Sequence, residues 1–142
     1  MDQSNVTHSE HLCVLIHGYG SFHSAQFSDT DRARRLWGTP VHFANVVKTL
    51  RERYSKERLH ILVSERNSGY FTYDGIETCG ERVCQEIEKE IEKLARDGRV
   101  LKKLSIVGYS LGGLVARYVI GLLYSKRIFE KIEPAVSISV LS

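Results

Sequence analysis

The chain has 142 residues, of which 42% are hydrophobic and 26% charged, and this length and composition predict a single domain with a real core. Its net charge of +3 comes from 20 basic and 17 acidic residues, which is too even a balance to indicate a nucleic-acid partner. The longest apolar stretch, residues 111–124, contains Arg117 and is too short to span a bilayer.

The first predicted element is a strand over residues 12–17, because "LCVLIH" is a continuous apolar run typical of a strand buried on both faces. Residues 19–35 follow without any periodicity, and we expect an unusually long loop there. A helix is then predicted from Pro40, since Thr39 and Pro40 form a cap and first-turn signal. Its apolar residues recur at helical spacing: Phe43, Val46, Val47, Leu50 and Tyr54.

Residues 59–64 predict a second buried strand. The next helix is expected to begin at Thr78, because Thr78 and Glu81 have the spacing of a capping box. Gly98 is its predicted stop. The charged face of this helix, "EIEKEIEK", is expected to be solvated rather than to bind a partner. The apolar stripe opposite consists of Val83, Ile87, Ile91 and Leu94.

The third predicted strand covers residues 104–109, and a helix starts directly after Ser110 and runs to about Ser125. Residues 134–140 predict a fourth, less apolar strand. Strands that alternate with helices in this way imply right-handed crossovers and a parallel sheet. The predicted fold class is therefore α/β.

The motif with the clearest chemistry is Gly108-Tyr109-Ser110-Leu111-Gly112, which matches G-x-S-x-G. In a nucleophile elbow this motif places the serine on a tight strand-to-helix turn, and the glycines are needed because strand and helix pass very close. The amide of Leu111 is an expected oxyanion donor, helped by the positive end of the helix dipole. The alternative is an idle serine in a glycine-rich turn.

His17 and Gly18 end the first predicted strand. In folds with a nucleophile elbow, the loop after this strand supplies the second oxyanion amide. Tyr19 is the candidate donor here, and Gly20 would allow close backbone approach. Simple packing at a strand end remains the alternative role for His17.

Together these motifs resemble the serine esterase family of α/β-hydrolases, and within it the fungal lipases that include lipid-droplet phospholipases. The resemblance covers most of residues 11–135, and its last segment is the most specific. The matching segments are "HLCVLIHG" from His11, "LWGTPVHFANVVKTLRERY" from Leu36, "YDGIETCGERV" from Tyr73 and "IVGYSLGGLVARYVIG" from Ile106.

The resemblance implies an α/β-hydrolase-type three-layer sandwich, present in part, with a mostly parallel sheet of about four strands. Residues 1–10 would be a polar tail, and residues 11–142 the N-terminal part of the hydrolase domain. It further implies hydrolysis of acyl esters in phospholipids or acylglycerols at a lipid droplet or another membrane surface, as part of lipid catabolism. Serine, aspartate and histidine would act in that chain order, with no cofactor.

Two features depart from the family pattern. Residues 19–35 separate Gly18 from Leu36, which the family would place beside it. All six histidines precede Ser110, and no aspartate follows it. We therefore expect a truncated or mis-spliced gene product that includes intron sequence, because Val136-Ser137 can be encoded by a splice-donor consensus. Without the aspartate and histidine partners, we expect this chain to show little or no activity by itself.

The remaining sequence features concern compartment and metal. The cysteines, Cys13, Cys79 and Cys84, form no CxxC pair, which favours a reducing compartment. The first ten residues lack the apolar core of a signal peptide, so we expect a cytoplasmic protein that is not secreted. No metal is implied, because the histidines and carboxylates show no ligand spacing.

Two alternatives to a lipase remain open. The chain could be a binding module that keeps the hydrolase fold without catalysis, or another hydrolase of acyl esters or thioesters, which the same motif permits.

Overall fold

The computed structural model describes residues 11–17, 40–65, 74–109 and 111–140, and strands alternate with helices throughout this part of the chain. The predicted alternation is confirmed. The elements are β1 (His11–Ile16), α2 (Pro40–Arg53), β2 (Leu59–Val63), α3 (Ile76–Arg96), β3 (Lys103–Tyr109), α4 (Leu111–Ser125), the short 3-10 helix η2 (Ile128–Glu130) and β4 (Glu133–Val140).

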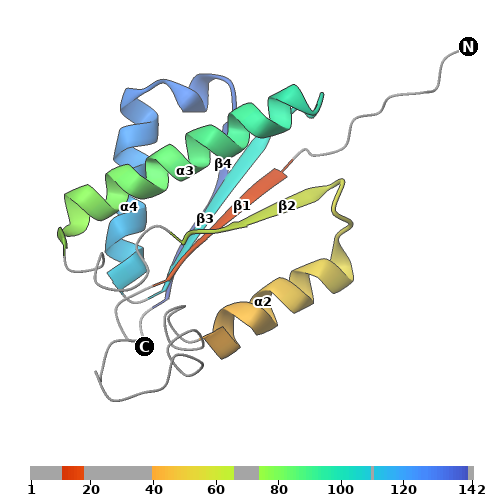
Figure 1. Ribbon diagram of the computed structural model, residues 1–142, viewed down its shortest axis with the longest axis horizontal. Helices are drawn as coiled ribbons and strands as arrows, with labels where there is room; N and C mark the ends of the chain where they lie inside the picture. The colour runs from red at the N-terminus through yellow and green to blue at the C-terminus, as the bar shows by residue number, and fades with distance from the viewer. Residues whose placement is uncertain (1–10, 18–39, 66–73, 110, 141–142) are drawn as a thin grey trace, which may run out of the picture.

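The strands form one parallel sheet in the order β2-β1-β3-β4. Helices α3 and α4 lie against one face of this sheet, and α2 lies on the other side (Figure 1). The structure is thus a three-layer α/β arrangement around four parallel strands, as the sequence predicts. Because all strands run the same way, their carboxyl ends meet at one edge, where α4 also begins (Figure 1).

The central strand β1 shows why its sequence is apolar without alternation. Leu12, Val14 and Ile16 pack in the larger core cluster beneath α3 and α4. Cys13 and Leu15 belong to the smaller cluster on the opposite face. Both faces of β1 are therefore covered, and a strand buried on two sides needs an apolar residue at every position.

Helix α2 packs on its face of the sheet through only some of the apolar residues that recur at helical spacing. Val47 and Leu50 pack against the smaller cluster. Val46 is 38% exposed, and Tyr54, which directly follows the helix, is 48% exposed, so these two residues of the apolar spacing do not lie in the core.

Both ends of α3 depend on glycines with positive φ. Gly75, with φ of 97°, is the N-cap, and no side chain caps the helix start. The predicted capping box at Thr78 is therefore wrong, because the helix begins two residues earlier, at Ile76. At the other end Gly98, with φ of 76°, is the stop that the sequence predicts. The amides of Gly98 and Arg99 donate to the carbonyls of Ala95 and Leu94 in a Schellman motif.

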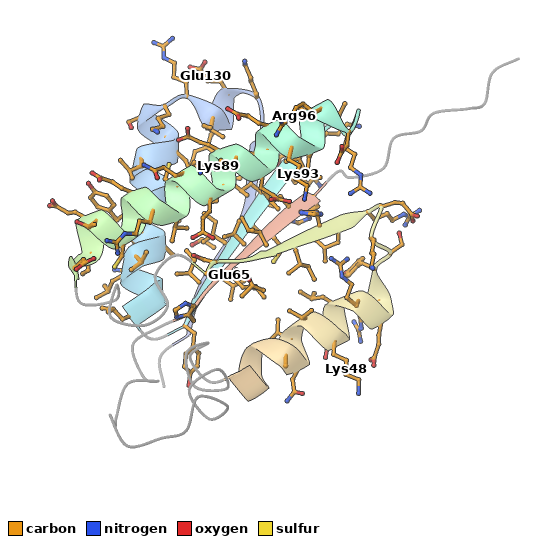
Figure 2. All side chains as sticks on the ribbon, viewed as in Figure 1. Lys48, Glu65, Lys89, Lys93, Arg96 and Glu130 are labelled. Atoms are coloured by element: carbon orange, nitrogen blue, oxygen red, sulfur yellow. The ribbon has the colours of Figure 1, made fainter. Side chains whose placement is uncertain are left out.

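The charged face of α3 is only partly solvated. Lys89, Lys93 and Arg96 are exposed along the helix (Figure 2). Glu88 and Glu90 of the same face are half-buried, and each binds a basic residue of a neighbouring element. The prediction of a purely solvated face is corrected to this extent.

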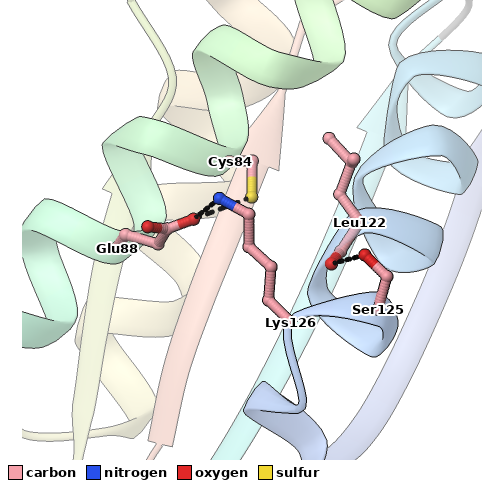
Figure 3. Close-up of polar contacts among 5 residues, drawn as sticks. All are labelled: Cys84, Glu88, Leu122, Ser125 and Lys126. Carbon is pink, nitrogen blue, oxygen red and sulfur yellow. Dashed lines mark hydrogen bonds and ion pairs between the residues drawn. The ribbon is translucent and has the colours of Figure 1, made fainter.

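Helices α3 and α4 are also joined at two points. Glu88 accepts hydrogen bonds from Lys126 and, at 3.3 Å, from the thiol of Cys84 (Figure 3). Nearer the start of α3, a Cβ on Gly80 would collide with the ring of Tyr118 in α4. The small residue at position 80 therefore sets how closely the two helices approach.

The three cysteines are predicted to be chemically inert in the folded protein. Burial raises the pKa of the Cys13 and Cys84 thiols to about 11, and for Cys84 the hydrogen bond to Glu88 adds to it. Burial also raises the pKa of Cys79. Since only the thiolate reacts readily, all three should react slowly with a disulfide reagent at about pH 8 in native protein, and quickly after denaturation. Rapid native reaction of any one thiol would contradict this.

Candidate functional site

The candidate site lies at the carboxyl edge of the sheet. Here β1 ends at Ile16, β3 ends at Tyr109, and α4 begins at Leu111 (Figure 1). Only one residue, Ser110, separates the strand from the helix. Ser110 itself lies outside the described residues, so its surroundings are given by the residues on either side. In open parallel α/β sheets, ligands bind at this edge.

The two glycines of the G-x-S-x-G motif are fixed by close backbone packing. A Cβ on Gly108 would collide with the carbonyl oxygen of Gly112 and would lie 2.6 Å from the Cα of Gly113. A Cβ on Gly112 would collide with the carbonyl oxygen of Ile16 and lie 2.8 Å from that of His17. No other residue type fits either position without a backbone shift, so β3, α4 and the end of β1 meet with no side chain between them.

His17 and Leu111 both lie at this edge of the sheet. His17 follows the last residue of β1, is 6% exposed, and its backbone packs against Gly112. Leu111 is the first residue of α4 and is half-buried. The structure therefore brings His17, Gly108, Leu111 and Gly112 together around position 110. The other two predicted site residues, Gly18 and Tyr19, lie outside the described residues.

The start of α4 is suited to an anion. The helix has 15 residues and no acidic residue in its first turn, so no side chain there offsets the positive end of the dipole. Free backbone amides of a first helical turn stabilise negative charge that develops on a nearby oxygen. This property belongs to the backbone and does not depend on the identity of the side chains.

A polar contact at the end of β2 is part of the same edge, and the sequence pattern does not predict it. Ser64, the residue after β2, is 1% exposed, and its hydroxyl donates to Glu86 of α3 at 2.8 Å. The next residue, Glu65, is labelled at the end of β2 in Figure 2, and its backbone amide donates to the same carboxylate at 3.1 Å.

A small hollow lies away from this edge. It has a volume of about 140 Å³ and lies between α4 and β4. Its lining is mainly apolar and comprises Leu104, Ile106, Ile120, Phe129, Pro134, Ala135 and Ser137. Because Leu104 and Ile106 precede Gly108 on β3, this hollow is displaced from position 110 toward the amino end of the strand.

Two negative findings apply to the part of the chain that the structure describes. No helix in it combines the length and apolarity that crossing a membrane requires. Within the same residues, no three histidine, cysteine, aspartate or glutamate side chains are grouped so that they could hold a metal ion.

Comparison with known proteins gives one result. Residues 7–142 match the protein family described as "Putative serine esterase (DUF676)". Searches of curated proteins and of solved structures give no match. The match covers nearly the whole chain, including every element of the sheet and the G-x-S-x-G segment. The chain therefore belongs to this serine esterase family of hydrolases.

Proposed function

We propose that Ser110 is the nucleophile of a serine esterase that cleaves acyl esters of lipids, either phospholipids or acylglycerols. The observation that carries the proposal is the packing of Gly108 and Gly112 against each other and against the end of β1. This packing leaves a single residue, Ser110, between a buried strand and the amino end of a helix. That is the context in which a G-x-S-x-G motif forms a nucleophile elbow.

The proposed reaction begins with attack of the Ser110 hydroxyl oxygen on the ester carbonyl carbon. The serine proton passes to a general base, for which the family resemblance implies a histidine that follows the serine in the chain. The carbonyl oxygen becomes an oxyanion that accepts hydrogen bonds from the amides of Leu111 and Tyr19. Collapse of this intermediate expels the alcohol, which takes up the proton and leaves an acyl-serine. Attack by water then releases the fatty acid and restores Ser110.

The lipid substrate and the working location rest on the family resemblance. The fungal lipases that this chain resembles include lipid-droplet phospholipases. We therefore propose a lipid substrate and a lipid-droplet or membrane surface for this protein, reached from the cytoplasm. No cofactor takes part in the proposed chemistry, because a serine nucleophile, a general base, oxyanion donors and water together carry out ester hydrolysis.

The test is covalent labelling of Ser110 by a fluorophosphonate probe, located by mass spectrometry. We expect one adduct on Ser110, formed at least about tenfold faster in folded than in denatured protein, because preorganised amides stabilise the transition state even without a base. Ser110→Ala should form no adduct at this position. Phospholipid or acylglycerol micelles should slow the labelling by competition.

Other outcomes would contradict the proposal. Labelling at the same rate in folded and denatured protein would show that the fold does not activate Ser110. No adduct in folded protein, combined with micelle binding, would favour the alternative of a non-catalytic binding module. A thioester that competes better than either lipid would move the substrate class to thioesters.

A further inference from the structure

Glu86 holds the chain where it leaves β2. One carboxylate oxygen accepts from the Ser64 hydroxyl at 2.8 Å, and the other accepts from the Glu65 backbone amide at 3.1 Å. Ser64 is almost fully buried, so the bond to its hydroxyl is shielded from water. A single side chain of α3 therefore fixes two consecutive residues at the carboxyl edge of the sheet.

These contacts continue from β2 toward position 110. The backbone amide of Ser64 donates to the carbonyl of Leu15 at 2.9 Å, which extends the pairing of β1 and β2 beyond the last residue of β2. The next two residues of the chain, Ile16 and His17, present the carbonyl oxygens that pack against Gly112. A continuous series of contacts thus runs from Glu86 through Ser64 and β1 to the first turn of α4.

Backbone position at the start of α4 matters for the proposed reaction, because oxyanion donors act only within a narrow range of distance. Catalytic groups must be held within about 0.5 Å of the productive geometry, and a displacement of about 1 Å can cost about 100-fold in rate. We propose that Glu86 is a positioning residue for Ser110, which it holds in place through Ser64 and the end of β1. This inference rests on the proposed function of Ser110.

The same pair of elements provides a matched control. Glu90 lies one turn further along α3, and its carboxylate binds the ring of His60 in β2 at 2.6 Å. Glu86 and Glu90 are thus both half-buried glutamates of α3, and each binds β2 or the residues directly after it. They differ in place, because His60 is near the start of β2 and Ser64 follows its end. If both glutamates only stabilised the packing of α3 on the sheet, replacing either one should change the labelling rate of Ser110 equally. A positioning role for Glu86 predicts a larger change when Glu86 is replaced.

The experiment compares the rate of fluorophosphonate labelling at Ser110 in Glu86→Ala and Glu90→Ala. We expect Glu86→Ala to slow labelling at least about tenfold and Glu90→Ala to change it by less than about twofold. Glu86→Gln should restore the rate in part, because its amide oxygen can still accept from Ser64 whereas its NH2 group cannot accept from the Glu65 amide. Equal slowing in the two alanine variants would overturn the proposal, as would an unchanged rate in Glu86→Ala.

A second measurement separates this inference from the proposed function. Hydrogen exchange at Ser64 and at Val115 and Ala116, whose amides bond to the carbonyls of the first turn of α4, should quicken in Glu86→Ala and remain unchanged in Glu90→Ala. If Ser110 fails to label in the unmodified protein, the proposed function fails, and the exchange comparison still decides whether Glu86 acts on the start of α4. Equal exchange in the two variants would contradict the positioning role. Should Glu86→Ala not fold, Ser64→Ala removes the buried one of the two contacts and takes its place in both measurements.

Discussion

Replacing Gly112 by alanine is expected to destabilise the protein by about 2–3 kcal/mol, although alanine is the better helix former by about 1 kcal/mol. The added Cβ would collide with the carbonyl oxygen of Ile16 and approach that of His17 to 2.8 Å. These are backbone atoms of a buried strand, which cannot move aside by changing a rotamer. The free energy of unfolding from denaturant titration measures the effect.

Gly121→Ala is the matched control for this substitution. Gly121 belongs to the same helix and is exposed, and a Cβ added there would meet no atom of another described element within 4 Å. The same chemical change should therefore stabilise the protein by about 0.5–1 kcal/mol through helix propensity alone. If both variants gained stability, the close contact of α4 with the end of β1 would be refuted.

Ile87→Ala is expected to lower the free energy of unfolding by about 3–4 kcal/mol, because it leaves a cavity in the main core. Ile87 is 0% exposed and packs among the residues that join α3 and α4 to the sheet. Domains of this kind have total stabilities of about 5–15 kcal/mol, so the loss would remove a large share of the total. Thermal unfolding and denaturant titration both measure this loss of stability.

Ile76→Ala is the matched control for Ile87→Ala, because it makes the same change in the same helix without leaving a cavity in the core. Ile76 is the first residue of the same helix and is 37% exposed. Its replacement should cost less than about 1 kcal/mol, since fewer apolar contacts with the core are lost. Similar losses for the two variants would mean that α3 does not pack through the stripe that contains Ile87.

The order of elements could be predicted from the sequence because each strand of a parallel sheet is apolar throughout and each helix has one apolar stripe. Element boundaries are harder to predict. The capping-box pattern predicts that α3 starts at Thr78, and the structure begins the helix at Ile76 after a glycine N-cap. A helix can begin after a glycine with positive φ instead of after a residue whose side chain caps it. The residue pattern does not show which of the two occurs, because it does not reveal the φ of Gly75.

The candidate site was predictable to the extent that it depends on local sequence. The G-x-S-x-G motif identifies Ser110, and Gly108, Leu111 and Gly112 follow from it because they are its neighbours in the chain. Glu86 could not be found in this way. Its partners, Ser64 and Glu65, are about 20 residues away, and their meeting depends on how α3 crosses the end of β2.

By itself the sequence determined the α/β class, the parallel sheet and the place of Ser110 between strand and helix, because these follow from periodicity and from neighbouring residues. Only the tertiary structure decided which backbone atoms surround the two glycines and which side chain fixes the end of β2. Ile16 and Gly112 are far apart in the chain, and their contact arises because β1 and β3 are adjacent in the sheet. Such contacts are set by the packing of whole elements, which leaves no local pattern in the sequence.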